Sequence, residues 1–543
     1  MSPQRSTTRP PRVPARVAFV GGGPGDPDLL TVRATRLLAM AGAVVVDQVA
    51  RDELALRHAP ADIEIVDAGH GDQGERLTQA SRAKLVVRTA KAHPGGLVVR
   101  LMDGDPAVFN GLAEEAQALV KANVAFEVVP GVSAIAAVPS YAGVPLTSKT
   151  TNSIHVVAAG GVVPDVAGGV DPASTVVVLG APDKAAETLR ALVAAGRDGD
   201  TPVAVTERGT TTGQRTVVTT LADAAEVMAS GRFPVLAVVG DTVRMRDALS
   251  WFETKPLFGW SVLVPRTKEQ SGSMTERLMH HGARAEVVPT ISVEPPRTPQ
   301  QLERAVKGMV TGRYEWVGFT SVNAVRAIRE KFDEFGLDAR SFAGLKVAAV
   351  GGVTADALRE WGINPDLVPT DEQSAQGLLD AWPPYDVDLD PINRVFLPRA
   401  DIATDTLVAG LQDSGWEVDD VTAYRTVRAA PPPAPVRDAI KAGAFDAVLF
   451  TSSSTVRNLV GIAGKPSPST VIACIGPATA KTAEEHGLRV DVMAAEPSVE
   501  ELTVALADFG ASRRADLVES GQPVTKPSER KAAKAPSRRK TSS

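Results

Sequence analysis

Short apolar runs that alternate with stretches of helical spacing constrain the fold of this chain most strongly. The run Val17–Val20 precedes a Leu, Ala and Arg-rich stretch over 29–41, and Val98–Leu101 precedes a similar stretch over 112–122. This alternation of strand and helix patterns predicts layered α/β units. Since the chain has 543 residues, and a domain usually has about 150, we expect several such units.

Composition argues against several classes of protein. The formal net charge of −6 disfavours a nucleic-acid binder that works through its overall field. A single cysteine, Cys474, excludes a disulfide within the chain, and the seven dispersed histidines make a protein-bound metal unexpected. No apolar run approaches the roughly 18 residues of a membrane span. The Arg/Pro-rich start also lacks the apolar core of a secretion signal, so we expect a cytoplasmic protein without membrane or nucleic-acid partners.

Changes in composition predict where the chain divides. Residues 1–15 are expected to form a disordered arm, and 16–250 a first α/β domain. The segment 251–260 (WFETKPLFGW) has the proline and glycine of a linker. A second domain is expected over 261–510, and the basic residues 511–543 are expected to form a disordered tail.

The second domain contains a weak internal repeat. FTSVNAV at 319–325 resembles FTSSSTV at 450–456, and VGGVTA at 350–355 resembles IGPATA at 475–480. The copies lie much farther apart than the units of a solenoid. The repeat therefore predicts two similar α/β lobes, one of about 261–292 plus 430–510 and the other of about 293–429. A cleft between such lobes is a natural ligand site.

A glycine-rich loop (GGGPGDP, 21–27) follows the first predicted strand, but it is not a dinucleotide fingerprint. Asp26 stands where the last glycine of that fingerprint would be, and there is no phosphate-binding lysine. Two prolines remove backbone N–H donors that a phosphate cradle needs. A tight turn that carries one carboxylate is favoured, with a plain strand-to-helix connection as the alternative.

Four turns in order carry a family resemblance: GGGPGDPDLLT at 21–31, MDGDP at 102–106, VPGVSA at 129–134 and AGVPLT at 142–147. Together they resemble the tetrapyrrole methyltransferases, in particular uroporphyrinogen-III C-methyltransferases, across about residues 16–250. The resemblance implies a two-subdomain α/β unit that binds S-adenosylmethionine in a folded conformation. It also implies a homodimer through this domain, because the family is usually dimeric.

The resemblance implies roles for particular residues. Asp47 would assist removal of a proton from the methylated pyrrole carbon. The residues implied to contact the cofactor are Pro24 from the first turn, Asp103, Gly104 and Asp105 from the second, Ser133 and Ala134 from the third, and Leu179 near the adenine.

This sequence also departs from the family pattern. Asp103 replaces a glycine, Met102 replaces a lysine, and Gly111 stands where an arginine is usual. Because uroporphyrinogen carries eight carboxylates, the missing cations should weaken its binding. A first domain that is only a silent scaffold therefore stands as an alternative to an active methyltransferase.

The second domain resembles uroporphyrinogen-III synthase across about residues 260–510. The resemblance rests on VLVPRTKEQ at 262–270, both Thr-Ser turns, both Gly-x-x-Thr-Ala turns and Tyr424-Arg-Thr426. It implies that hydroxymethylbilane, a linear tetrapyrrole, is closed to uroporphyrinogen III with inversion of ring D, with no cofactor. The two reactions would be consecutive, which makes a fusion of the domains chemically sensible.

The chemistry of ring closure selects candidate residues. The leaving hydroxide needs a proton, and Tyr424 is the candidate acid, although this tyrosine could instead merely pack at a strand end. Serine and threonine before a helix can bind carboxylates and cap the helix at the same time. The candidate substrate-binding residues are Arg266, Ser321, Asn323, Thr354, Ser452, Ser453 and Thr479.

The sequence thus predicts a multifunctional enzyme of tetrapyrrole biosynthesis, a lyase joined to a methyltransferase, with tetrapyrroles as its small-molecule partners. Two alternatives remain open. In one, only the synthase is active. In the other, from a different class, the two lobes form a non-catalytic small-molecule binding module.

Overall fold

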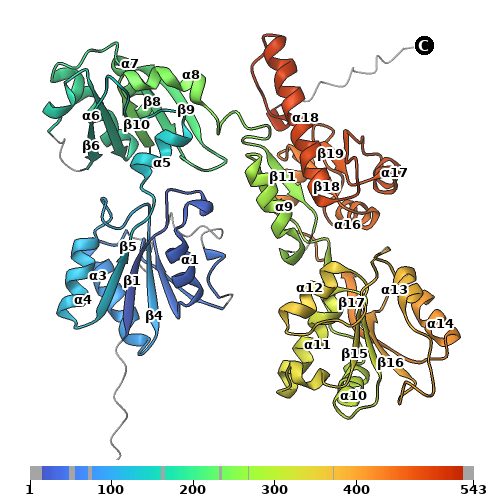
Figure 1. Ribbon diagram of the computed structural model, residues 1–543. Coiled ribbons are helices and arrows are strands. Elements are labelled where there is room, and N and C mark those ends of the chain that lie inside the picture. The colour runs from blue at the N-terminus through green and yellow to red at the C-terminus, as the bar shows by residue number, and fades with distance from the viewer. Residues whose placement is uncertain are drawn as a thin grey trace, which may run out of the picture. The chain divides into compact units, whose positions relative to one another are not determined.

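The structure, a computed structural model, describes residues 15–47, 56–60, 62–70, 76–160, 165–231, 235–266, 268–370 and 372–529. The chain separates into two compact units, the first centred on residues 1–261 and the second on 285–505. Each unit contains two five-stranded sheets (Figure 1). Sheets and helices occur together in both units, which confirms the predicted α/β class. Most of the predicted N-terminal arm, residues 1–14, lies outside the described residues.

The first sheet is parallel, with strand order β3-β2-β4-β1-β5. Alternate residues of β1 face opposite layers: Val20 packs with Leu38 of α1, and Phe19 packs with Val86 of α3 and Leu119 of α4. Helices therefore cover both faces, which explains the continuous apolar runs of the strands. The elements are β1 (Arg16–Gly21), α1 (Val32–Ala39), β2 (Ala43–Val46), β3 (Glu64–Asp67), α3 (Gln79–Ala92), β4 (Leu97–Met102), α4 (Leu112–Lys121), β5 (Ala125–Val129) and α5 (Ala134–Tyr141).

The second sheet is mixed, in the order β6-β7-β10-β8-β9, with only the β6–β7 pair parallel. Its core joins Val176 and Val203 of the strands to Leu189 of α6 and Met228 of α7. The elements are β6 (Ser153–Ala159), β7 (Ser174–Gly180), α6 (Pro182–Ala194), β8 (Pro202–Glu207), β9 (Arg215–Thr220), α7 (Leu221–Ala229), β10 (Val235–Val239) and α8 (Arg246–Leu249).

The third and fourth sheets make up the second unit. Their strand orders are β12-β11-β18-β19-β20 and β13-β17-β16-β14-β15. The strands of the third sheet and the helices that connect them are β11 (Ser261–Val264), α9 (Lys268–His280), β12 (Arg284–Val287), α15 (Ala434–Ala442), β18 (Ala447–Phe450), α16 (Ser453–Ala463), β19 (Val471–Cys474), α17 (Pro477–Glu485) and β20 (Val492–Met493), followed by α18 (Val499–Glu519). The strands of the fourth sheet and the helices that connect them are β13 (Ile291–Glu294), α10 (Pro299–Val310), β14 (Trp316–Phe319), α11 (Val322–Phe335), β15 (Lys346–Ala349), α12 (Gly352–Glu360), α13 (Ala375–Ala381), β16 (Arg394–Ala400), α14 (Thr406–Asp413) and β17 (Glu417–Arg428).

The internal repeat corresponds to a repeated strand–helix–strand–helix path. In one copy β14 leads through Ser321 into α11, and in the other β18 leads through Ser452 into α16; both serines are helix N-caps. The later turns match as well, because Gly351 precedes α12 and Gly476 precedes α17. The similar motifs thus mark equivalent positions in two separate sheets.

The C-terminal region differs from the expected disorder. Helix α18 runs to Glu519, and residues 506–526 group with the first unit. Ala, Leu and Arg continue the helix beyond 511, and the Arg513 guanidinium donates to the carbonyl of Thr525. The prediction of a disordered tail is therefore wrong over 511–519. Residues 530–543 lie outside the described residues.

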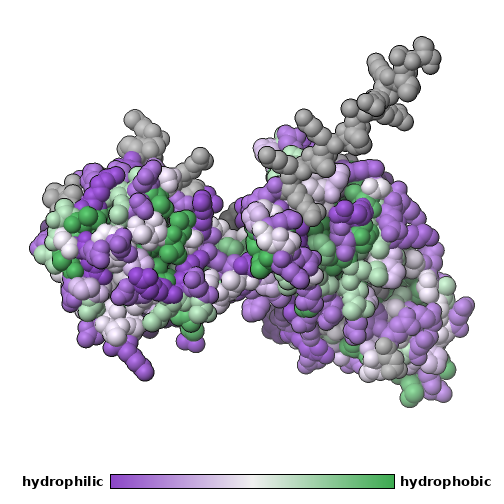
Figure 2. All heavy atoms as spheres, turned by 90° about the horizontal axis from the view of Figure 1, so that it is seen from above, coloured by the Kyte–Doolittle hydropathy of each residue, from purple (hydrophilic) through white to green (hydrophobic). Residues whose placement is uncertain are grey.

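Charged and polar residues cover most of the face drawn in Figure 2, between smaller apolar areas. In the described part of the chain, no helix is long and apolar enough to cross a membrane. Cys474 is fully buried in the third sheet, and burial raises the pKa of its thiol to about 12, so it is an inert core residue.

Three glycines of the first unit bring their backbones into close approach. A Cβ on Gly21 would lie 2.4 Å from the Cα of Gly131, and a Cβ on Gly131 would lie 2.1 Å from the carbonyl oxygen of Gly104.

We predict that Gly131→Ala lowers the free energy of unfolding of the first unit by more than about 2 kcal/mol, because the turns must separate. Gly160→Ala is the matched control, since a Cβ there meets no atom within 4 Å among the residues that the structure describes, chain neighbours aside. Equal thermal stability of the two variants would contradict the close approach.

Candidate functional site

The three turns that follow β1, β4 and β5 line one cavity of about 540 Å³ in the first unit. Neighbouring parallel strands place their carboxyl ends at the same sheet edge. The second sheet completes the lining through residues around Leu179, Thr206, Arg208 and Leu236. The seven residues predicted to bind a cofactor all line this cavity: Pro24, Asp103, Gly104, Asp105, Ser133, Ala134 and Leu179.

Backbone hydrogen bonds within the turns explain why the first loop is not a phosphate cradle. Gly23 and Gly104 exchange N–H to carbonyl bonds of 3.3 and 2.8 Å, and the N–H of Gly22 donates to Met102 at 2.7 Å. The Asp105 carboxylate accepts the N–H of Gly131 at 3.0 Å and so joins the second turn to the third. Donors that are already used in this way cannot surround a phosphate.

The cavity suits a nucleoside ligand that carries a positive charge rather than a phosphate. Its walls are largely apolar, with Pro24, Val138, Leu179 and Leu236 among them. One acidic side chain of the lining, Asp103, has no hydrogen bond to its carboxylate in the described part of the chain. The size, the apolar lining and the carboxylate fit the sulfonium nucleoside S-adenosylmethionine.

An ion cluster lies beside the turns. The fully buried guanidinium of Arg100 donates to Glu115 at 2.8 Å and to both oxygens of Asp47 at 3.0 Å, and Arg82 approaches Asp47 at 3.8 Å. Burial, together with the Asp47 charge, raises the pKa of Asp103 to about 6, against the opposing effect of Arg100 and Arg82. Asp47 itself is not among the residues that line the cavity.

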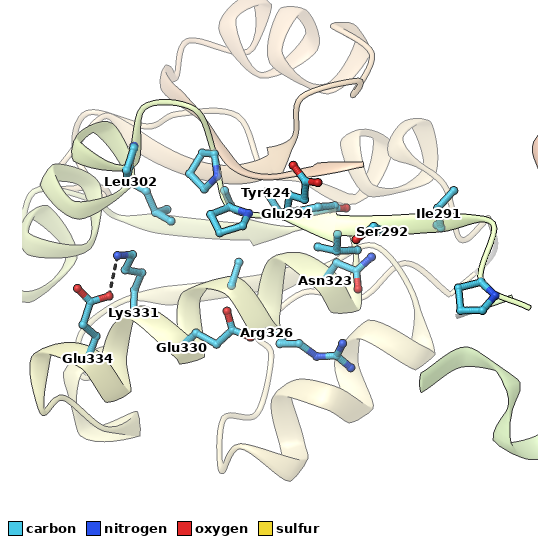
Figure 3. Close-up of a pocket in the computed structure, with 17 residues that line it drawn as sticks. Ile291, Ser292, Glu294, Leu302, Asn323, Arg326, Glu330, Lys331, Glu334 and Tyr424 are labelled. Carbon is cyan, nitrogen blue, oxygen red and sulfur yellow. Dashed lines mark hydrogen bonds and ion pairs between the residues drawn. The ribbon is translucent and has the colours of Figure 1, made fainter. Parts of the chain in front are cut away.

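A second cavity, of about 580 Å³, lies in the second unit against the fourth sheet (Figure 3). Tyr424 on β17 and Asn323 in the first turn of α11 both line it, as do Ser292, Glu294 and residues of α11 as far as Glu334. The Tyr424 hydroxyl lies 2.9 Å from the hydroxyl of Ser321. The structure therefore brings together three of the predicted synthase residues.

The remaining predicted synthase residues do not line this cavity. Ser452 caps α16 through the N–H of Thr455, and Ser453 donates to the carbonyl of Ala478. Thr354 and Thr479 are buried, each in the first turn of its helix. Arg266 follows β11 in the third sheet, where burial lowers the pKa of its guanidinium.

Comparison with known proteins identifies both halves. Residues 16–225 match the family model for tetrapyrrole (corrin/porphyrin) methylases, and residues 272–503 match the model for uroporphyrinogen-III synthase HemD. A porphyrin biosynthesis protein HemD from Ruminiclostridium josui is 31% identical over 506 residues, which cover 91% of this chain and 98% of the relative. The chain belongs to this HemD family.

The first half of the chain has relatives of its own. An S-adenosyl-L-methionine-dependent uroporphyrinogen III methyltransferase from Methanosarcina barkeri is 38% identical over 251 residues, which cover 43% of the chain and 94% of the relative. A crystal structure of the uroporphyrin III C-methyltransferase from Thermus thermophilus shares 36% identity and covers 42% of the chain and 99% of that protein, with a TM-score of 0.37. The predicted family resemblances of both halves are confirmed.

Sequence reasoning missed Arg326 in this HemD chain. It lines the second cavity from α11, one turn after Asn323, and is exposed with no ion pair in the described part of the chain. The repeat contained the signal, because the residue after FTSVNAV is Arg326 and the residue after FTSSSTV is Arg457. Both arginines are exposed, and each is the fifth residue of its helix, α11 or α16.

The raised pKa of Asp103 predicts a pH-dependent stability. Its pKa of about 6 exceeds the ordinary 3.8, so the folded state holds the proton more tightly than the unfolded state. Ionised Asp103 therefore destabilises the fold above about pH 6, and this cost disappears below about pH 4. We expect Asp103→Asn to raise the melting temperature at about pH 7.5 and this gain to shrink as the pH falls toward 5. A gain in melting temperature that is the same at every pH would contradict the raised pKa of Asp103.

Proposed function

We propose that this chain closes hydroxymethylbilane to uroporphyrinogen III in its second half, over about 261–510, and methylates that product toward precorrin-2 in its first half, over about 16–250. The single observation that carries the proposal is the pair of cavities: all seven predicted cofactor residues line the first, and the predicted acid Tyr424 lines the second together with Asn323. Membership of the HemD family supports the synthase. The methyltransferase relatives support the use of S-adenosylmethionine.

The synthase half must protonate a leaving hydroxide and hold a flexible chain in one folded shape. Tyr424 is the proposed donor of a proton to that hydroxide, because it lines the cavity from β17. When Ser321 donates to the Tyr424 oxygen, the tyrosine proton stays available and the developing phenolate is stabilised. The C–O bond of the substrate then breaks, and its electron pair leaves on oxygen, which takes the Tyr424 proton and departs as water. A C–C bond closes the ring, and the pyrrole carbon that forms this bond releases its proton, which restores the Tyr424 hydroxyl.

Carboxylate anchoring supplies the folded substrate shape. Arg326 and Asn323 of α11 line the cavity, and their side chains suit the carboxylates of the tetrapyrrole. From the third sheet, Arg266, Ser452, Ser453, Thr479 and Arg457 are proposed to bind further carboxylates, and Thr354 to support the fourth-sheet turn. No cofactor is proposed for this half.

The methyltransferase half binds its methyl donor in the first cavity. S-adenosylmethionine supplies an electrophilic methyl group when it is bound. The residues that would hold it are Pro24, Gly104, Asp105, Ser133, Ala134 and Leu179. Asp103 is the better candidate to take the proton that the pyrrole ring releases, because it lines the cavity, whereas the Asp47 carboxylate is bound by Arg100. The homodimer and the cytoplasmic location stay predictions.

Replacing the proposed acid tests the synthase. We expect Tyr424→Phe to slow enzymatic ring closure by about a hundredfold, so that the product of hydroxymethylbilane shifts from isomer III to the spontaneous isomer I. Tyr314→Phe is the matched control, because it also loses a buried hydroxyl, one that donates to Asp419 at 2.7 Å outside the cavity. Equal rates for Tyr424→Phe and the parent chain would remove Tyr424 from the mechanism.

Replacing the arginine of the second cavity tests the anchoring. We expect Arg326→Ala to raise the KM for hydroxymethylbilane about tenfold with little change in kcat, since the arginine would bind the substrate equally well in the ground state and in the transition state. Arg329→Ala is the control, because Arg329 is exposed on the same helix and does not line the cavity. A similar KM for the two variants would count against the carboxylate site.

The protonation of Asp103 tests the methyltransferase. The rate of uroporphyrinogen III methylation should rise with pH through about 6, as Asp103 loses its proton and becomes able to accept another. In Asp103→Asn the rate should fall and this rise should vanish. If Asp103→Asn kept the pH profile of the parent chain, Asp47 or solvent, and not Asp103, would accept the pyrrole proton.

A further inference from the structure

The loop that closes the first cavity from the side of the second sheet has a strained backbone. Arg208 and Thr210 adopt left-handed φ angles of 48° and 65°, which side chains other than glycine rarely take. Arg208, Gly209 and Thr211 all line the cavity. Such a conformation persists only where neighbouring groups hold it, so the contacts of Thr210 determine the shape of this rim.

The partly buried carboxylate of Glu253 supports the strained loop through hydrogen bonds. The N–H of Thr210 donates to the Gln214 side-chain carbonyl at 2.7 Å, and the Gln214 amide donates to Glu253 at 2.8 Å. Glu253 also accepts from Thr216 at 2.6 Å and from Arg246 at 2.6 Å. Thr210 and Gln214 are 2% and 4% exposed, so this chain of hydrogen bonds is protected from water.

The opposite rim of the cavity is joined to the same network. The N–H of Asp26, which directly follows the Gly-Pro-Gly turn, donates to the Thr210 hydroxyl at 3.1 Å. A Cβ on Gly25 would lie only 2.8 Å from the Thr211 methyl carbon. The Asp26 carboxylate accepts from the Tyr141 hydroxyl at 2.8 Å.

The segment 251–253 contacts both of these paths. The ring of Tyr141 packs edge-on against Trp251 and Phe252, with centroid distances of 5.0 and 4.6 Å. Glu253 follows directly and carries the hydrogen bonds to Gln214 and Thr216. This segment begins the predicted linker, yet the structure packs it against the two rims of the cavity.

We propose that Glu253 is a positioning residue of the methyl-donor cavity: through Gln214 and Thr210 it fixes the strained rim against the Gly-Pro-Gly turn. The inference rests on the proposed function of the first half. It assigns to the segment that joins the two halves a part in binding S-adenosylmethionine, although Glu253 does not itself line the cavity.

Calorimetric titration of the full chain with S-adenosylmethionine and with S-adenosylhomocysteine tests this role. We expect Glu253→Leu to weaken the affinity for both ligands about tenfold, since the rim loses its support. Glu253→Gln keeps a carbonyl acceptor for Gln214 and Thr216, and should stay within about threefold of the parent. The KM for S-adenosylmethionine should rise, whereas the KM for uroporphyrinogen III and the ring-closure rate should not change.

Glu127→Leu is the matched control. Glu127 is also a partly buried carboxylate of the first unit with two arginine partners, Arg16 and Arg33, and it does not line the cavity. The Glu127→Leu variant should lower the melting temperature without changing the affinity for S-adenosylmethionine or for S-adenosylhomocysteine. An equal loss of affinity in Glu127→Leu would reduce the Glu253 effect to general destabilisation and overturn the proposal.

A second pair of variants applies if Glu253→Leu does not fold. Thr210→Val removes the hydroxyl that accepts from Asp26, whereas Thr210→Ser keeps it, so only the first should lose affinity. Unchanged affinity in Thr210→Val would overturn the proposal. Failure of the parent chain to bind either ligand would instead overturn the proposed function of the first half.

Discussion

The close approach of three glycine turns is the constraint on which the first unit depends. The strands β4, β1 and β5 are neighbours and parallel, and each ends in a turn that contains Gly104, Gly21 or Gly131. Because the backbones meet at distances that leave no room for a Cβ, the turns form one continuous wall at the sheet edge. That wall uses its own N–H groups internally, and this is why the cavity suits a ligand without phosphate.

The second unit reaches its site by a different route, the repetition of one local motif. A strand that ends in Phe-Thr-Ser leads into a helix capped by the serine, once at Ser321 and once at Ser452. The capping bond fixes the helix start, and the same serine hydroxyl then lies beside Tyr424 in the first copy. Structural and chemical roles are thus compatible in one side chain.

The sequence predicted those parts of the fold and site that local patterns encode. Strand and helix positions such as 16–21 and 112–121 followed from apolar periodicity, and the lining of the first cavity followed from motif turns at neighbouring strand ends. Long-range pairing was not predictable in this way. The ion pair between Arg100 and Asp47 joins residues far apart in the chain. The helix through 511–519 was not predicted, because its charge-rich composition is typical of disordered tails. Arg326 could have been found, because its counterpart Arg457 ends the same repeat.

One chain is proposed to carry out two consecutive reactions at two separate cavities. Incubation of the full chain with freshly prepared hydroxymethylbilane, with and without S-adenosylmethionine, tests it most directly when the oxidised products are analysed by chromatography and mass spectrometry. We expect isomer III in both samples, with a gain of one or two methyl groups only where S-adenosylmethionine is present. Isomer III without any gain of mass would contradict the methyltransferase, and isomer I alone would contradict the synthase.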